Sequence, residues 1–257
     1  REPAWSPDGS RLAYAADRGE GFDVFVVAMK NGVASGQPVA ATTMPGDERW
    51  PSWTADGRLV FAHRDARPSG RGGDPSLQYD VYLSMPVSGS DAWQAPQALT
   101  ETEDSETYPR VSPDGLKVAF ISERDSEDDL DLWWMPVPAA AITKPIPLGA
   151  KPPKPVSSSV QSVGTDGKPL RANRITRVRG HEAYPSWAPD NSRVAFYAVR
   201  EGIGSLWVAT AEPPRPEPTE DPIPRLKPAA QPQLVSRRGG APAWSPDGKT
   251  LLVTGLP

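Results

Sequence analysis

The sequence predicts an all-β protein, a β-propeller built from four-stranded antiparallel blades. A phrase made of Pro-x-Trp and Ser-Pro-Asp-Gly opens the chain after Glu2 and returns near its end after Ala241. Three diverged copies follow Trp50, Tyr108 and Tyr184. Each copy is followed by short apolar runs rich in β-forming residues, and no segment shows the periodicity of an amphipathic helix. Four-stranded units that repeat about every 40 to 50 residues are typical of propellers.

Each complete unit contains four predicted strands, the first being the Pro-x-Trp segment itself. The second follows in all five copies and starts at Arg11, Arg58, Lys117, Arg193 and Thr250. The third starts at Asp23, Asp80, Asp131 and Ser205, and a weaker fourth at Gln37, Pro96, Asn173 and Pro232. The chain therefore holds four complete blades and half of a fifth. Its strands are apolar on both faces, as expected where each blade is covered by two neighbours.

The turn between the first two strands has a backbone explanation. In the segment Ser6–Gly9, Pro7 fixes φ at the second position of a type I turn, and Gly9 supplies the left-handed conformation that returns the chain. Asn191 replaces this glycine in the fourth copy, and asparagine is the next best residue for that conformation. The motif therefore has a structural role rather than a chemical one.

Composition excludes several classes of function. The net charge is −4, from 28 basic and 32 acidic residues, which gives no general reason to expect a nucleic-acid partner or an anionic membrane. No apolar run approaches the roughly 18 residues that a membrane span needs, so direct membrane insertion is not expected. Cysteine is absent, which excludes disulfides, thiol catalysis and cysteine-ligated zinc.

The repeated phrase and the apolar runs after it, such as "DVFVVAM" from Asp23, resemble the repeat of TolB-type propellers, which is related to the WD repeat. The resemblance covers nearly the whole chain. It implies six blades in the intact ring, a location in the periplasm or at the cell surface, and binding of partner peptides or lipoproteins at the channel mouth. It specifies the fold more than the function, because the propeller domains of oligopeptidase-like and tricorn-like peptidases carry the same repeat.

We expect residues 1–257 to form a single propeller domain that is part of a longer protein. The fifth unit stops after two strands, and the first lacks the outer strand that should come before it. The alternative is a ring whose two ends share one blade. The stretches 138–172 and 211–232 are predicted proline-rich inserts without a core of their own. They are either arms that lie along a neighbouring subunit or excursions on the surface.

The loops on one face of the predicted propeller form a charged channel mouth. These are the inter-blade loops, which join an outer strand to the next inner strand, and the loops between second and third strands. An acidic sector and a basic sector there would orient a charged partner. The alternative is that these are solvated charges and that the aromatic side chains only fill the channel. The candidate partner-binding residues are Asp47, Glu48, Arg49, Trp50, Glu101, Glu103, Asp104, Glu106, Tyr108, His181, Glu182, Tyr184, Arg237 and Arg238.

Catalytic, metal and cofactor motifs are mostly missing. The acidic loop with Glu123, Asp125, Asp128 and Asp129 is a weak candidate for calcium, because it lacks the glycine and the spacing of a calcium loop. The segment 202–206 lacks the last glycine of a serine nucleophile turn. The sequence therefore predicts no catalytic residue and no cofactor within this chain. The recurring aspartates are interpreted as structural acceptors; they are Asp23, Asp80 and Asp131.

These observations favour a non-catalytic propeller that binds a partner protein, or stands in a larger assembly, through its charged mouth. The alternative is a propeller domain that gates a hydrolase of the oligopeptidase or amidohydrolase type, whose catalytic domain lies outside this chain.

Overall fold

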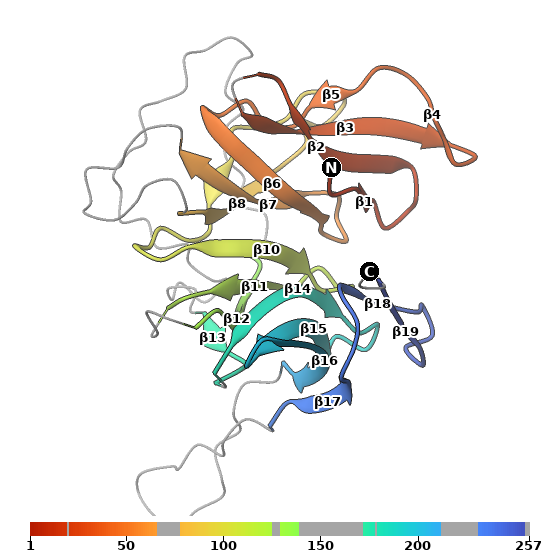
Figure 1. Cartoon of the computed structure of the whole chain (residues 1–257). Coiled ribbons are helices and arrows are strands. Elements are labelled where there is room, and N and C mark those ends of the chain that lie inside the picture. The colour runs from red at the N-terminus through yellow and green to blue at the C-terminus, as the bar shows by residue number, and fades with distance from the viewer. Residues whose placement is uncertain are drawn as a thin grey trace, which may run out of the picture.

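The computed structural model of the chain describes residues 1–19, 21–65, 78–124, 129–138, 172–177, 179–211 and 231–254. Within these ranges all regular secondary structure is β-strand, as predicted. The strands form five antiparallel sheets, one for each copy of the repeat (Figure 1). The described residues contain no helix that is long and apolar enough to cross a bilayer.

The first two sheets are built in chain order. The first contains β1 (Ala4–Trp5), β2 (Arg11–Asp17), β3 (Phe22–Lys30) and β5 (Val39–Ala40), with β4 (Val33–Ala34) as a short hairpin on the end of β3. The second contains β6 (Gly46–Trp53), β7 (Leu59–Asp65), β8 (Asp80–Ser84) and β9 (Gln97–Ala98). Both sheets therefore have the strand order that the repeat predicts.

The remaining sheets continue the same pattern. The third contains β10 (Glu106–Val111), β11 (Lys117–Ser122), β12 (Asp131–Pro136) and β13 (Asn173–Arg174). The fourth contains β14 (His181–Trp187), β15 (Arg193–Arg200), β16 (Ile203–Thr210) and β17 (Gln233–Ser236). The fifth contains β18 (Pro242–Trp244) and β19 (Leu251–Val253). The strands β1 and β18 lie in different sheets.

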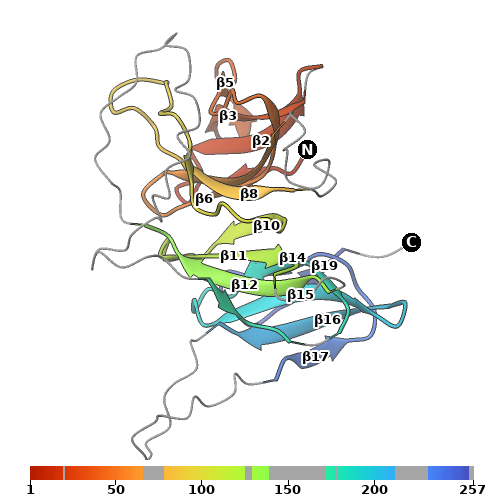
Figure 2. The same ribbon diagram turned by 90° about the vertical axis from the view of Figure 1, so that its left-hand side faces the viewer.

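The sheets are arranged as successive blades around their first strands. Each first strand contacts the next one along the chain, from β1 through β6, β10 and β14 to β18. Figure 2 shows the sheet of β10, β11 and β12 lying between the sheet that contains β6 and β8 and the sheet that runs from β14 to β17. The predicted inserts 138–172 and 211–232 fall almost entirely outside the described residues, so their role stays a prediction.

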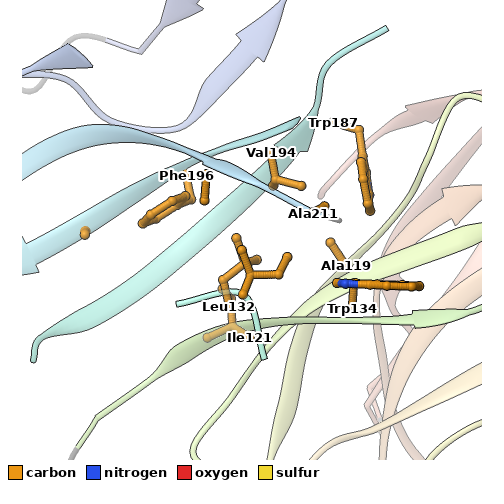
Figure 3. Close-up of a cluster of buried hydrophobic side chains, with 11 residues drawn as sticks. Ala119, Ile121, Leu132, Trp134, Trp187, Val194, Phe196 and Ala211 are labelled. Carbon is orange, nitrogen blue, oxygen red and sulfur yellow. The ribbon is translucent and has the colours of Figure 1, made fainter. Parts of the chain in front are cut away.

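The described apolar core is divided into three clusters, and each cluster lies between two successive blades. Between the third and fourth blades, Ile121 and Leu132 from one sheet face Val194 and Phe196 from the other (Figure 3). All four side chains are fully buried. Burial of each such side chain contributes about 1.5 to 3 kcal/mol, so the interface between blades is the main source of stability.

A tryptophan on the first strand locks each of three junctions to the preceding blade. The indole Nε1 of Trp53 donates to the carbonyl of Ala4 at 2.9 Å, and the indole Nε1 of Trp187 donates to the carbonyl of Arg110 at 2.8 Å. Trp244 makes the same contact with Ser186 at 3.2 Å. At the remaining junction, valine replaces tryptophan. The recurring tryptophan is therefore a packing residue with a polar contact across the blade boundary.

The loops sort onto two faces, as the repeat predicts. Turns between first and second strands meet on one face, where Asn191 accepts a hydrogen bond from the amide of Asp114 at 3.0 Å. Lys117 donates to the carbonyl of the same Asn191 at 3.1 Å. On the other face the inter-blade loops meet the loops between second and third strands. For example, the amide of Gly180 in an inter-blade loop donates a hydrogen bond to Asp129 in a loop between second and third strands, at 3.0 Å. This second face carries the loops that were expected at the channel mouth, and we call it the mouth.

Three buried carboxyl pairs cross the blade boundaries near the mouth. In each pair an aspartate at the start of a third strand meets a glutamate on the first strand of the next blade; the pairs are Asp23 with Glu48, Asp80 with Glu106, and Asp131 with Glu182. The glutamates are at most 1% exposed. At the fourth junction, Ser205 and Gly239 occupy the two equivalent positions. Both members are replaced together there, which indicates that the pair acts as one unit.

The pairs hold a proton that isolated carboxyl groups would have lost. Burial, and then the hydrogen bond and charge of Glu48, raise the pKa of Asp23 to about 6. Burial, and then the charge of Glu106, raise the pKa of Asp80 to about 8. Oε2 of Glu48 and Oε2 of Glu106 have no other hydrogen-bond donor in the described residues. A protonated Asp23 or Asp80 supplies that donor, so these two junctions are satisfied only while the proton stays. In the third pair, burial raises the pKa of Glu182 itself to about 8.

We expect Trp187→Phe to lower the free energy of unfolding by at least about 2 kcal/mol, because it removes a buried hydrogen bond and leaves a void between blades. Trp5 is the matched control, since it occupies the same repeat position but is 52% exposed. Trp5→Phe should change stability by less than about 0.5 kcal/mol. Urea denaturation of the two variants measures the difference, and equal losses would show that the contact across the blade boundary is not what stabilises the fold.

The carboxyl pairs predict that stability falls as pH rises. A raised folded pKa means that the folded state binds more protons, so stability is fully present below about pH 4 and is lost as pH rises through about 6 to 8. The limiting slope is about 1.4 kcal/mol per pH unit for each proton retained. Asp80→Asn keeps a donor for Glu106 and should flatten the slope between pH 5 and 9, measured by urea midpoints. Glu101→Gln, at an exposed site in the adjacent loop, should leave the slope unchanged.

Candidate partner-binding site

The candidate site begins with a backbone irregularity that recurs in four first strands. The residue before the recurring proline has a positive φ in each of these copies; these residues are Glu2 (55°), Trp50 (53°), Tyr108 (53°) and Tyr184 (53°). In β6, β10 and β14 the pairing register shifts at this point, which marks a β-bulge. Bulky residues rarely adopt this conformation, and it costs about 1 to 3 kcal/mol at each position. The bulge redirects the side chain that it carries.

The redirected side chains form a continuous row across the blades. The ring centroids of Trp50 and Tyr108 are 4.5 Å apart, and those of Tyr108 and Tyr184 are 4.8 Å apart. Tyr79, which precedes β8, adds an edge contact to Trp50 at 5.1 Å. Aromatic pairs at these separations attract each other beyond their area of contact. We call Trp50, Tyr108 and Tyr184 the aromatic row.

A charged pair fixes the end of the row next to the first blade. The Glu2 carboxylate accepts hydrogen bonds from Arg49 Nε and from the amide of Trp50, the latter at 2.8 Å. The guanidinium of Arg49 in turn lies over the rings of Phe22 and Trp50, at 4.6 and 5.1 Å from their centroids. The hydrogen bond to Glu2 raises the pKa of Arg49 further. This end of the row is therefore rigid and its charge is compensated.

The other end of the row remains accessible. Tyr184 is 40% exposed, whereas Tyr108 and Trp50 are half-buried. Burial, and then the neighbouring hydroxyl of Tyr184, raise the pKa of Tyr108 to about 12, so the phenol of Tyr108 stays a neutral hydrogen-bonding group. The row thus presents apolar ring faces with polar hydroxyl tips. Such a surface suits non-covalent recognition of a chain that carries both apolar and polar groups.

The predicted charged residues of the mouth divide into exposed and buried groups. Glu101, Glu103, His181, Arg237 and Arg238 are exposed. Asp104 and Asp47 are half-buried; Asp47 accepts a hydrogen bond from the amide of Phe22 at 3.0 Å and pairs with Arg64. The amide of Ser105 donates to Glu123 at 3.4 Å, which brings the two acidic loops of the third blade together.

The structure corrects three residues that were expected at the surface. Glu48, Glu106 and Glu182 are buried at the blade boundaries and are not available to a partner. Glu106 pairs with Arg124 at 3.0 Å and Glu48 with His63 at 2.8 Å. Their position in loop-like, charged sequence suggested exposure, but the bulged first strand begins earlier than the sequence indicates and carries them inward.

The weak calcium candidate is only partly described. Asp125 and Asp128 lie outside the described residues, and no group of three or more potential metal ligands occurs in the part of the chain that the structure describes. Ser205, in the segment that distantly resembles a nucleophile turn, lies buried in β16. Its hydroxyl donates to the carbonyl of Ala198 at 3.3 Å and accepts from Trp207 at 2.7 Å.

Three residues of this region were not singled out by the sequence. Glu2 occupies the same position before proline as the aromatic row, and Tyr79 lies between two charged loops. Arg110 stands where the other copies carry Ala4, Ser52, Ser186 and Ala243. The replacement of a small residue by Arg110 was the sequence signal that could have identified this position.

In sequence, the chain is similar to a curated bacterial protein. No family model matches the chain. A curated relative, an uncharacterised protein of Agrobacterium fabrum, is 24% identical over 193 residues, which are 75% of this chain and 52% of the relative. This chain therefore spans about half the length of the curated relative that it matches.

Structural comparison is more informative. TolB from Acinetobacter baumannii is similar with a TM-score of 0.61 at 14% identity, over 100% of this chain and 49% of that one. A putative TolB from Agrobacterium tumefaciens gives 0.59 at 16% identity, over 100% of this chain and 74% of that one. The tricorn protease gives 0.57 at 13% identity, over 98% of this chain and 24% of that one. Likeness at this level of identity establishes architecture, and the chain has the fold of TolB-type β-propellers.

Proposed function

We propose that this propeller binds a partner protein by taking a segment of it onto the aromatic row, with the charged loops of the mouth orienting the approach. The observation that carries the proposal is the row itself. Three aromatic residues in strained conformations are held in contact across three blades, and the row ends in the 40% exposed ring of Tyr184. Clustered tyrosine and tryptophan side chains are typical of binding hot spots.

The surroundings of the row support protein recognition. Glu101 and Glu103 are exposed next to the third blade, and Arg237 and Arg238 are exposed next to the fifth. Rim charges of opposite sign steer association and fix orientation more than they add affinity. A rigid aromatic centre with a charged rim is the usual anatomy of a protein interface.

The resemblance to TolB-type propellers bears on the kind of partner and on the location of the protein. It supports a protein partner or a larger assembly, and a location in the periplasm or at the cell surface. The alternative, a propeller that gates a hydrolase lying outside this chain, rests on the same resemblance to peptidase propellers. Affinity capture of partners together with the sequence of the complete gene product separates the two proposals.

We expect Tyr184→Ala to weaken partner capture at least about tenfold, because the ring is the exposed end of the row and truncation of an interface tyrosine typically costs more than 1 kcal/mol. Leu116→Ala is the matched control, since Leu116 is apolar and 65% exposed but lies in a turn on the opposite face. Quantitative pull-down followed by calorimetry with the captured partner measures both. Equal binding by the two variants would contradict the proposal.

The acidic sector should act mainly on association. Replacing Glu101 and Glu103 with lysine should change the association rate about tenfold and alter its dependence on salt, while dissociation changes little. Asp91→Lys reverses an exposed charge in the loop between β8 and β9, which lies away from the mouth, and should have no effect. Surface plasmon resonance at several ionic strengths distinguishes these outcomes. An unchanged association rate would remove the acidic sector from the site.

A further inference from the structure

Arg110 breaks the repeat at a position that faces the centre of the propeller. It lies on β10 two residues after Tyr108, and the four equivalent residues are alanine or serine: Ala4, Ser52, Ser186 and Ala243. Its backbone carbonyl accepts a hydrogen bond from the indole of Trp187, so its backbone is fixed by the junction between blades three and four. The small residues in the other copies show that the fold needs no long side chain here.

The guanidinium of Arg110 has no acidic partner in the part of the chain that the structure describes. Its only hydrogen bond there runs from Nη1 to the carbonyl of the adjacent Pro109, at 3.0 Å. Most other half-buried arginines are paired with carboxylates, as Arg124 is with Glu106 at 3.0 Å and Arg200 is with Glu182 at 3.5 Å. In the described residues Arg11 also lacks such a partner, but its guanidinium lies over the ring of Trp53, at 5.4 Å from the centroid. Arg110 has neither a carboxylate nor an aromatic ring as a partner there.

The environment of Arg110 disfavours its charge. Burial lowers the pKa of its guanidinium, and the residue is half-buried. The nearby Glu2 carboxylate opposes this effect only from a distance, because it is already engaged by Arg49 and by the amide of Trp50. Withdrawing a charge without a partner is costly, so the position is suited to an external anion.

We propose that Arg110 binds a carboxylate of the partner segment that lies on the aromatic row. The inference rests on the proposed function and adds the chemistry of the ligand. A guanidinium donates two parallel hydrogen bonds to a carboxylate, which gives orientation as well as affinity. A single uncompensated cation beside Tyr108 suits one negative charge next to an apolar or aromatic group, rather than a multiply charged phosphate.

The carboxylate has two possible sources, a free chain terminus or an acidic side chain, and small probes separate them. N-acetylphenylalanine carries a terminal carboxylate, N-acetyl-aspartyl-phenylalaninamide carries a side-chain carboxylate, and N-acetylphenylalaninamide carries none. We expect the probe with the matching carboxylate to bind about ten- to a hundredfold more tightly than the amide. Perturbation of the Arg110 Nε–H and Tyr184 signals by NMR titration locates the binding.

Variants of Arg110 test the assignment directly. Arg110→Gln should abolish the preference for the carboxylate probe over the amide, and Arg110→Lys should retain part of it. Arg193→Gln is the control, because Arg193 pairs with Asp190 on the opposite face and its loss should leave the preference intact. No carboxylate preference in the unmodified protein, or a preference that survives Arg110→Gln, would overturn the proposal.

Thermal unfolding without any probe gives a second, independent readout. If Arg110 serves a ligand, Arg110→Gln should unfold at the same or a higher temperature than the unmodified protein, and a clear decrease would assign the arginine to the fold instead. The carboxylate site and the proposed function can also be rejected independently of each other. Loss of partner capture in Tyr184→Ala but not in Arg110→Gln would reject the carboxylate site alone. Unchanged capture in Tyr184→Ala would reject the proposed function, while the probe titrations would still decide on Arg110.

Discussion

Each sheet of this protein buries its apolar surface only against the next sheet, and the rest of the structure depends on that constraint. The three core clusters lie between blades, and the indoles of Trp53, Trp187 and Trp244 donate across the same boundaries. The carboxyl pairs near the mouth add polar contacts to these interfaces. Because apolar packing fixes the spacing of the first strands, it also fixes the distances between the side chains that those strands send toward the centre.

The same constraint explains how a strained site is tolerated. A positive φ at Trp50, Tyr108 and Tyr184 is unfavourable locally, but the surrounding β-pairs on both sides of each bulge hold it in place. The bulge also turns the first strand so that a glutamate two residues earlier enters the blade boundary while the aromatic side chain joins the row. One local irregularity therefore produces both the buried polar junction and the candidate binding surface.

The fold could be read from the sequence because its signals are local and repeated. A turn of the Ser-Pro-Asp-Gly type, with some substitutions, and the β-forming runs recur in every copy, and even Asn191 in the left-handed position follows from backbone preference. The burial of Glu48, Glu106 and Glu182 could not be read from one copy, since their partners belong to the preceding blade. The joint replacement by Ser205 and Gly239 was visible in the sequence, but its meaning required the pairing of blades. The same distinction applies to Arg110. The sequence shows an arginine at a position that is alanine or serine in the other copies, but only the assembled structure shows that this arginine has no acidic partner in the described residues.

The location of the core between sheets has a consequence for how the chain folds. A single sheet has no apolar interior of its own, so the smallest cooperative unit is a pair of adjacent blades, and order should propagate from one pair to the next as in other nearest-neighbour systems. The sheet of β10 has such a neighbour on each side, so Tyr108 and Arg110 are held where two of these pairs overlap.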